Sequence, residues 1–328
     1  MFELIKKLAD VYGATGREGT VADVIEELLK DKVDVISRDV LGNLICEKRG
    51  TNPDGKRIML SAHMDHIGFI VAGIEKEGFL RVSPVGGVGI AVSRTRHVVF
   101  QNGVEGIIVQ EPVNEGVTPA MKHMFIDIGA ADEAEALSMI QLGDIAVYAP
   151  DCFRLGEHRV AAPAMDDRIA CALLVRVMQE LGETSDTVIA VFSTQEEVGC
   201  RGAKTAAYSV NPDIGIALDV TGNGDTPGTK LPSVKLGAGA AIKIMDRGSM
   251  SHPELVADLL AAGERAGVKT QREVLPYGGT DAMAMQVSRS GVKAGTISIP
   301  CRYVHSACEV IDLRDVDAAC ELLKAYLQ

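Results

Sequence analysis

Apolar residues recur along the chain in two patterns, one helical and one extended. The stretch 167–181 spaces Ile169, Leu173 and Val177 four residues apart, which places them on one face of a helix. Similar periods predict helices at 1–8, 18–31, 252–265, 280–288 and 312–327. Short runs rich in Val and Ile predict strands at 33–38, 43–48, 57–61, 187–193, 213–218, 234–245, 270–275 and 294–299. This alternation predicts an α/β fold with a mixed, mostly parallel sheet and flanking helices.

The middle of the chain, residues 69–160, has a different pattern. Gly, Pro and Asn separate one helical stretch at 132–142 from short extended pieces at 68–73, 79–84, 97–101, 106–109 and 144–147. Such a series is typical of a small β-barrel or sandwich, and we expect a barrel. We therefore predict one domain built from residues 1–68 and 161–328, with a small β-rich domain of residues 69–160 inserted into it.

Composition and charge exclude several classes of protein. With 328 residues, 47% of them hydrophobic, the chain can bury a large core. The net charge is -12 and no run of Lys or Arg exceeds two residues, which disfavours a nucleic-acid partner. No apolar stretch approaches the ~20 residues that span a bilayer, so we expect no membrane partner.

Cysteine usage indicates the cellular compartment. The seven cysteines are odd in number and contain no C-x-x-C pair, which fits a reducing environment. The first eight residues carry charge inside their apolar pattern and so lack the uninterrupted apolar core of a signal peptide. We therefore expect a cytoplasmic protein.

Residues of metal-binding type follow four predicted strands and open one predicted helix. The ligand crevice of an open α/β sheet lies outside the carboxyl ends of its strands, so these residues should meet at one edge. The candidates are His63, Asp166, Glu197, Asp219 and His305.

Three carboxylates and two imidazoles form a ligand set that suits zinc, with cobalt or manganese as alternatives. Five ligands exceed the needs of an open mononuclear zinc site. They fit two divalent ions about 3.5–4 Å apart that share a bridging carboxylate, for which we expect Asp166.

The neighbour of one predicted ligand is a candidate catalytic base. Glu196 adjoins Glu197 and can stay free to take a proton from a water that bridges the metals and pass it to a leaving amine. Asp65 follows His63 by two residues and could accept the other ring N–H of that imidazole.

Each of these residues also has a plain structural explanation. Adjacent glutamates are usually solvated, and an Asp at a helix start is usually an N-cap. Five residues of ligand type at one sheet edge favour the metal site. We interpret Cys200 as a packing residue in preference to a soft ligand, and Gly237 and Gly239 as glycines that allow close packing within an apolar strand.

Several short segments, taken in order, resemble those of the M42 metallopeptidases. These are the glutamyl or deblocking aminopeptidases that include the tetrahedral TET particles. The segments are AHMDHIG at 62–68, MDDR at 165–168, QEEVGCRGA at 195–203, ALDV at 217–220 and RYVHS at 302–306, together with DVLGN at 39–43, FIDIGA at 125–130 and GGTDA at 278–282.

The resemblance implies two metal sites that share one ligand: His63, Asp166 and Asp219 for the first, and Asp166, Glu197 and His305 for the second. It implies that Glu196 is the general base and that Asp65 orients His63. It also implies that residues 69–160 mediate subunit contacts in a homo-oligomer, which is built from dimers and in many members is a hollow dodecamer.

Two places depart from the family pattern. His66 stands where the family usually has an acidic residue, and the segment EPVN at 111–114 replaces a usual Pro-Pro-His-like segment. Neither change affects a predicted ligand.

We therefore expect a dinuclear metallo-aminopeptidase that removes N-terminal amino acids from peptide substrates. One alternative is a related dinuclear deacylase or carboxypeptidase, which would not need a free substrate amine. Another is a non-catalytic metal-binding assembly protein. Such a protein would be expected to have lost a ligand or the base, whereas all six positions are filled here.

Overall fold

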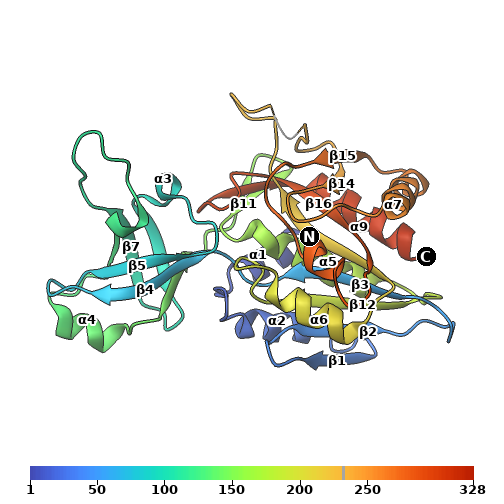
Figure 1. The fold of residues 1–328 in the computed structure, drawn as a ribbon, viewed down its shortest axis with the longest axis horizontal. Coiled ribbons are helices and arrows are strands. Elements are labelled where there is room, and N and C mark those ends of the chain that lie inside the picture. The colour runs from blue at the N-terminus through green and yellow to red at the C-terminus, as the bar shows by residue number, and fades with distance from the viewer. Residues whose placement is uncertain (231–232) are drawn as a thin grey trace.

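The computed structural model describes residues 1–230 and 233–328, which form a large helix-flanked sheet and a smaller barrel (Figure 1). Eleven strands of this described part make the large sheet. Along the sheet lie β1 (Val35–Arg38), β2 (Leu44–Lys48), β12 (Thr187–Ser193), β3 (Arg57–His63), β13 (Ile214–Thr221), β16 (Lys293–Arg302), β17 (Glu309–Asp312), β11 (Arg159–Ala162) and β10 (Phe153–Leu155), with β14 (Ala240–Met245) beside β16 and β15 (Thr270–Val274) beside β14.

The centre of the large sheet is parallel and its flanks are mixed. Strands β12, β3, β13 and β16 pair in parallel, while β2, β14 and β17 join them in the antiparallel sense. The predicted mixed sheet with flanking helices is thus confirmed, with β12–β3, β3–β13, β13–β16 and β14–β15 as its parallel pairs. Because β12, β3, β13 and β16 are parallel, their carboxyl ends meet at one edge of the sheet.

Helices cover both faces of the large sheet, because its central strands bury side chains on both sides. Along β3, Ile58 and Leu60 belong to one core, whereas Met59 belongs to another on the opposite face. The first core includes α1 (Phe2–Ala9), α2 (Gly19–Leu29), α5 (Met165–Glu180), α7 (Pro253–Ala266) and α9 (Leu313–Leu327). The second includes α6 (Arg201–Val210) and α8 (Ala282–Met285).

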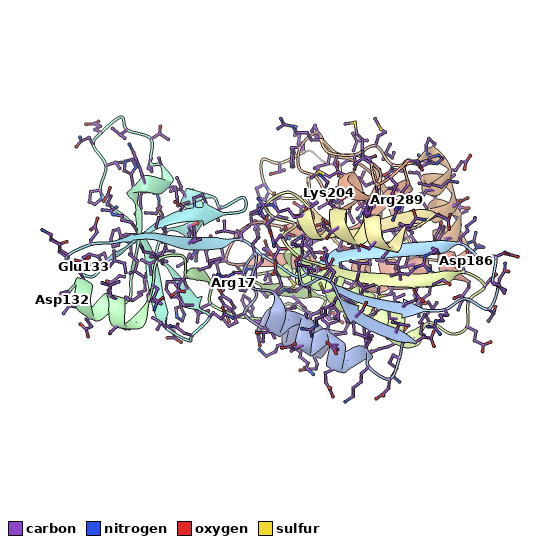
Figure 2. The ribbon with its side chains drawn as sticks, turned by 60° about the horizontal axis from the view of Figure 1, so that its bottom comes forward. Arg17, Asp132, Glu133, Asp186, Lys204 and Arg289 are labelled. Atoms are coloured by element: carbon purple, nitrogen blue, oxygen red, sulfur yellow. The ribbon has the colours of Figure 1, made fainter. Side chains whose placement is uncertain are left out.

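The smaller body is a closed antiparallel barrel with its own apolar core, which includes Phe69, Phe100 and Tyr148. Figure 2 shows Asp132, which caps α4, at the far end of this barrel and Asp186 at the opposite end of the molecule. In barrel order the strands are β4 (Gly68–Ile74), β5 (Leu80–Val85), β8 (Met124–Asp127), β7 (Glu105–Gln110), β6 (Arg96–Phe100) and β9 (Ile145–Tyr148), accompanied by α3 (Ile90–Ser93), the 3₁₀ turn Met121–His123 and α4 (Glu133–Met139).

The barrel strands lie between residues 68 and 148, whereas β10 and β11 pair within the large sheet. The predicted domain boundaries, and a role for residues 69–160 in subunit contacts, stay predictions. Among the described residues, no helix has both the length and the apolarity needed to cross a membrane.

Most predicted elements are present, and the errors lie in short or polar segments. The helix predicted at 280–288 covers only residues 282–285. Helix α6 was not predicted, because its small Ala and Gly residues give a weak apolar pattern. Strands β8, β10, β11 and β17 were also missed, since each has only three or four residues.

The strand predicted at 234–245 begins only at Ala240. The preceding glycines, Gly237 and Gly239, have positive φ angles of 78° and 98° and donate their backbone N–H groups to Asp315. The interpretation that they lie within a strand is therefore wrong. Close packing is confirmed for Gly239, because a Cβ there would lie 1.9 Å from the carbonyl oxygen of Lys269.

Candidate metal centre

The carboxyl edge of the central strands gathers the residues that the sequence singled out. Strand β3 ends at His63, β13 carries Asp219, β12 leads to the Glu196–Glu197 turn, β16 leads to His305, and α5 begins beside Asp166. The backbone of Asp166 and Asp167 is not helical, and the peptide bond between them is cis.

Asp166 lies between the two histidines. Its Oδ1 is 3.0 Å from Nε2 of His63, and its Oδ2 is 3.2 Å from Nε2 of His305. Nε2 of His305 is also 3.3 Å from Oε2 of Glu197. One carboxylate thus presents a separate oxygen to each imidazole, which is the arrangement expected of a bridging ligand.

Backbone carbonyls determine which nitrogen of each imidazole faces Asp166. Nδ1 of His63 lies 2.9 Å from the carbonyl oxygen of Asp65, and Nδ1 of His305 lies 3.1 Å from that of Gly87. Because a carbonyl can only accept, both Nδ1 atoms carry the proton in these contacts. Nε2 is then the nitrogen that a metal would bind in place of a proton.

Asp219 completes a second group of ligand atoms. One atom from each of His63, Asp167 and Asp219 lies within 4.8 Å of the others, as do atoms of Asp166, Glu197 and His305. Asp167 was not predicted as a site residue. Its Oδ2 accepts the backbone N–H of His63 at 3.2 Å, while its Oδ1 is buried without a partner among the described residues.

Asp65 holds the turn that carries the two glutamates. Its Oδ1 accepts the N–H of Glu196 at 2.9 Å and its Oδ2 the N–H of Glu197 at 3.3 Å. Oδ1 also lies 3.5 Å from Nδ1 of His63, farther than the carbonyl oxygen that Nδ1 contacts. The carboxylate therefore contacts the glutamate turn more closely than the imidazole it was predicted to orient.

The electrostatics are those of crowded buried carboxylates. Burial raises the pKa of Glu196, and the charge of Asp219 adds to the effect. Burial and the charge of Asp166 likewise raise the pKa of Asp219. Burial lowers the pKa of His305, but contacts with Asp166 and Glu197 outweigh it and raise the pKa to about 12. Negative groups here compete for protons, which is the environment that attracts a cation.

The donor set fits divalent metal ions. It combines imidazole nitrogen with carboxylate oxygen, as zinc, cobalt and manganese sites do. Oε1 of Glu197 is buried and has no hydrogen-bond partner among the described residues, although Oε2 of the same carboxylate contacts His305. A buried carboxylate oxygen without a donor is costly, and a bound cation would satisfy it.

Two buried carboxylates that support the site were not among the predicted site residues. Glu309 accepts the N–H of His305 at 2.6 Å and that of Asp166 at 2.9 Å, one on each oxygen, and so fixes the backbone of both residues. Asp281 accepts the hydroxyls of Ser61 and Ser193 at 2.7 and 2.6 Å, which ties β3 to β12. The GGTDA segment was a signal for Asp281, whereas no local pattern marked Glu309.

A glycine pair that follows barrel strand β5 packs directly against the site. A Cβ on Gly86 would lie 2.9 Å from Oε2 of Glu197, and one on Gly87 would lie 2.5 Å from Nδ1 of His305. Only residues without side chains let the backbone approach this closely. The barrel thus contributes to the wall of the metal centre.

A cleft of about 490 Å³ adjoins the site and is lined by Asp166, Asp219 and His305, with Asn223 and Tyr277 among its other residues. Its volume suits a small ligand. His66 lines a different cavity, between the N-terminal segment and the barrel, where burial lowers its pKa to about 3.

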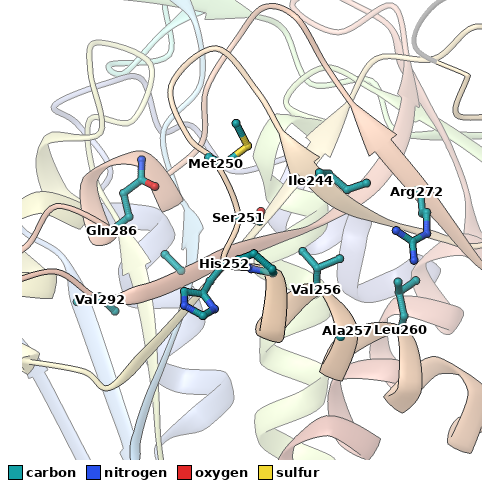
Figure 3. Close-up of a pocket in the computed structure, with 12 residues that line it drawn as sticks. Ile244, Met250, Ser251, His252, Val256, Ala257, Leu260, Arg272, Gln286 and Val292 are labelled. Carbon is teal, nitrogen blue, oxygen red and sulfur yellow. The ribbon is translucent and has the colours of Figure 1, made fainter.

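A further cavity of about 520 Å³ lies beside α7 and β14 (Figure 3). Its walls are mainly apolar, with Ile244, Val256 and Leu260 as examples, and include His252 and Arg272. None of the described residues that line it carries a carboxylate. It therefore lacks the oxygen ligands that characterise the candidate metal centre.

Comparison with known proteins identifies the family. Residues 42–322 match the family model of the M42 glutamyl aminopeptidases. The chain belongs to this family. The enzyme class expected from the sequence, a metallo-aminopeptidase that hydrolyses peptide bonds, is thereby confirmed.

Individual relatives of this M42 family member share its whole length. A candidate aminopeptidase of Acetivibrio thermocellus is 43% identical over 324 residues, covering 98% of this chain and 97% of the relative. The structure of an aminopeptidase from the archaeon Desulfurococcus kamchatkensis superposes with a TM-score of 0.95 at 39% identity, covering 99% and 94% of the two chains. A TET1 peptidase of Pyrococcus horikoshii, described as assembling into a tetrahedron or an octahedral shell, gives a TM-score of 0.89 at 32% identity, covering 99% and 98%.

Proposed function

We propose that this M42 peptidase is a dinuclear aminopeptidase with Glu196 as its general base. The observation that carries the proposal is the position of Asp166, which directs one oxygen to His63 and the other to His305. His63, Asp166 and Asp219 would hold one divalent ion, and Asp166, Glu197 and His305 the other. Zinc is the preferred metal, with cobalt or manganese as alternatives.

When bound, the two ions would polarise the scissile carbonyl and lower the pKa of the attacking water. The protein supplies the proton transfer. Oε2 of Glu196 lies 3.9 Å from Nε2 of His63, so this carboxylate faces the same space as the proposed ligands. We assign it to take a proton from the attacking water and to return it to the amine that leaves. Asp65 keeps the base in place through the N–H of Glu196.

The test is to replace Glu196 by Gln and assay amino-acid p-nitroanilides. Gln cannot accept the proton, so kcat should fall by about 100-fold to 10,000-fold while both metals stay bound. Glu264→Gln changes an exposed glutamate on α7 and serves as the matched control. Normal turnover by metal-loaded Glu196→Gln would refute the assigned base.

A second panel tests the exopeptidase character. An aminopeptidase needs the free amine of its substrate, whereas a deacylase or carboxypeptidase does not. Free peptides should be hydrolysed from the N-terminus and N-acetylated ones should resist. Cleavage of both sets at similar rates would contradict the proposal.

We further propose that the chain forms a homo-oligomer through residues 69–160. The TET1 relative is described as a particle, and several apolar side chains of this segment are exposed, among them Ile107, Val117, Leu137 and Leu142. Light scattering should give a multiple of 34.8 kDa, and Leu142→Asp should lower it if the barrel mediates contacts. A mass of one chain would contradict the proposed assembly.

A further inference from the structure

A third group of metal-binding atoms lies beside the proposed base. Glu196, Cys200 and Asp281 each present one ligand atom within 4.8 Å of the other two. This group shares none of the five proposed ligands of the dinuclear centre. Cys200 and Asp281 are 1% and 3% exposed, so the group is a buried one, and solvation of surface carboxylates does not explain it.

The hydrogen bonding of Asp281 is incomplete. Its Oδ2 accepts two hydroxyls, from Ser61 and Ser193. Its Oδ1 is buried and has no partner among the residues that the structure describes. Leaving a carboxylate oxygen without a donor in a protein interior is costly, so this oxygen is available to bind a cation.

The thiol of Cys200 contacts the base directly. Its Sγ donates to Oε1 of Glu196 at 3.0 Å, while Oε2 is the oxygen near His63. One carboxylate oxygen of the base therefore faces the dinuclear centre and the other faces the cysteine. The interpretation of Cys200 as a packing residue leaves this contact out of account.

We propose that Glu196, Cys200 and Asp281 form a third, inhibitory site for a thiophilic divalent cation, with Zn²⁺ as the natural occupant. One sulfur and two carboxylate oxygens suit zinc and cobalt and disfavour magnesium and calcium. Binding forms a metal–sulfur bond and breaks the S–H bond, and the released proton passes to solvent. This inference rests on the proposed function, because inhibition follows from engaging Glu196 as a ligand.

The third site should fill after the other two. The dinuclear centre offers five side chains, two of them imidazoles, whereas the third site offers three, so the dinuclear centre should bind metal more tightly. A cation at the third site must also displace the proton of the Cys200 thiol, which donates to Glu196. Two equivalents of metal should therefore activate the enzyme, and an excess should inhibit it.

Cobalt titration of the metal-free protein tests this site with a readout independent of activity. Thiolate bound to Co²⁺ gives a charge-transfer absorption in the near ultraviolet. We expect this band only after two equivalents are bound, and we expect three equivalents at saturation. Cys200→Ser should lack the band, whereas Cys320→Ser, which changes a buried cysteine on α9, should keep it.

The half-inhibitory zinc concentration is then measured for each variant, with its own rate at two equivalents of metal as the reference. Cys200→Ser removes a direct ligand, so the half-inhibitory zinc concentration should rise by at least about 100-fold. Mutating a residue that only hydrogen-bonds to a ligand already lowers metal affinity about 10–100-fold. If cobalt binding saturates at two equivalents without the band and the enzyme is active, the third site is refuted and the proposed function is unaffected. Fewer than two equivalents, or no turnover at two, overturns the proposed function instead.

Discussion

Arg168 is the largest fully buried side chain among the described residues, and its removal should destabilise the fold strongly. Its guanidinium donates to four backbone carbonyls, those of Leu8 and Met64 at 2.7 Å, Val11 at 3.0 Å and Gly13 at 3.2 Å. These contacts join the N-terminal segment to the residue that follows His63. The perturbation is Arg168→Met, which keeps much of the apolar stem and removes every donor.

The expected loss follows from the four carbonyls left without a donor. Each orphaned buried acceptor costs about 1 kcal/mol at the low end of the measured range, which gives about 4 kcal/mol in total. Removing the buried charge of Arg168 offsets part of this loss of stability, whereas the small cavity left by the shorter Met side chain adds to it. With an unfolding slope of about 3 kcal/mol/M in urea, the midpoint should fall by about 1.3 M.

The assay is urea unfolding of the metal-free protein, followed by circular dichroism. Arg176→Met is the matched control, because Arg176 lies on the same helix and pairs with Glu180 and Asp317 at a partly exposed position. Such surface pairs contribute less than about 1 kcal/mol, so its midpoint should move by less than about 0.3 M. Equal shifts for the two variants would refute the reasoning about buried carbonyls.

Three further predictions concern the metal centre. Chelation should abolish peptidase activity, and zinc or cobalt should restore it; full activity in chelator would contradict a metal requirement. Gly87→Ala should weaken metal binding by at least about 10-fold, because its Cβ meets the ring of His305. Gly182→Ala, where a Cβ meets nothing within 4 Å, should leave the affinity measured by calorimetry unchanged, and equal affinities for both variants would count against the barrel contact. Glu309→Gln replaces one acceptor oxygen by a donor, so Asp166 or His305 loses the hydrogen bond that fixes its backbone. Metal affinity should fall about 10–100-fold in the same assay. Wild-type affinity would show that these hydrogen bonds are dispensable.

The parallel centre of the sheet explains why so much of the site could be predicted from sequence. Apolar runs such as 187–193 marked the strands, and polar residues of ligand type followed them at the carboxyl ends. Once neighbouring strands are parallel, those ends must meet at one edge. His63 and Asp219 lie on β3 and β13, which pair in parallel, so their proximity follows from topology.

The residues that were missed depend on contacts that no local pattern encodes. Glu309 fixes Asp166 and His305 only because β17 turns back antiparallel to β16 and brings its carboxylate under both. Asp167 adjoins a predicted ligand, yet its burial beside Asp219 is a tertiary property. The Gly86–Gly87 pair was visible as a sequence, but its contact with His305 depends on how the barrel packs against the sheet.

The most direct test of the central claim is a crystal structure of the zinc-loaded protein with anomalous scattering measured at the zinc edge. Two peaks are predicted at limiting zinc, one contacted by His63 and Asp219 and the other by Glu197 and His305, with Asp166 contacting both. A single peak, or two peaks that do not share Asp166, would contradict the dinuclear centre.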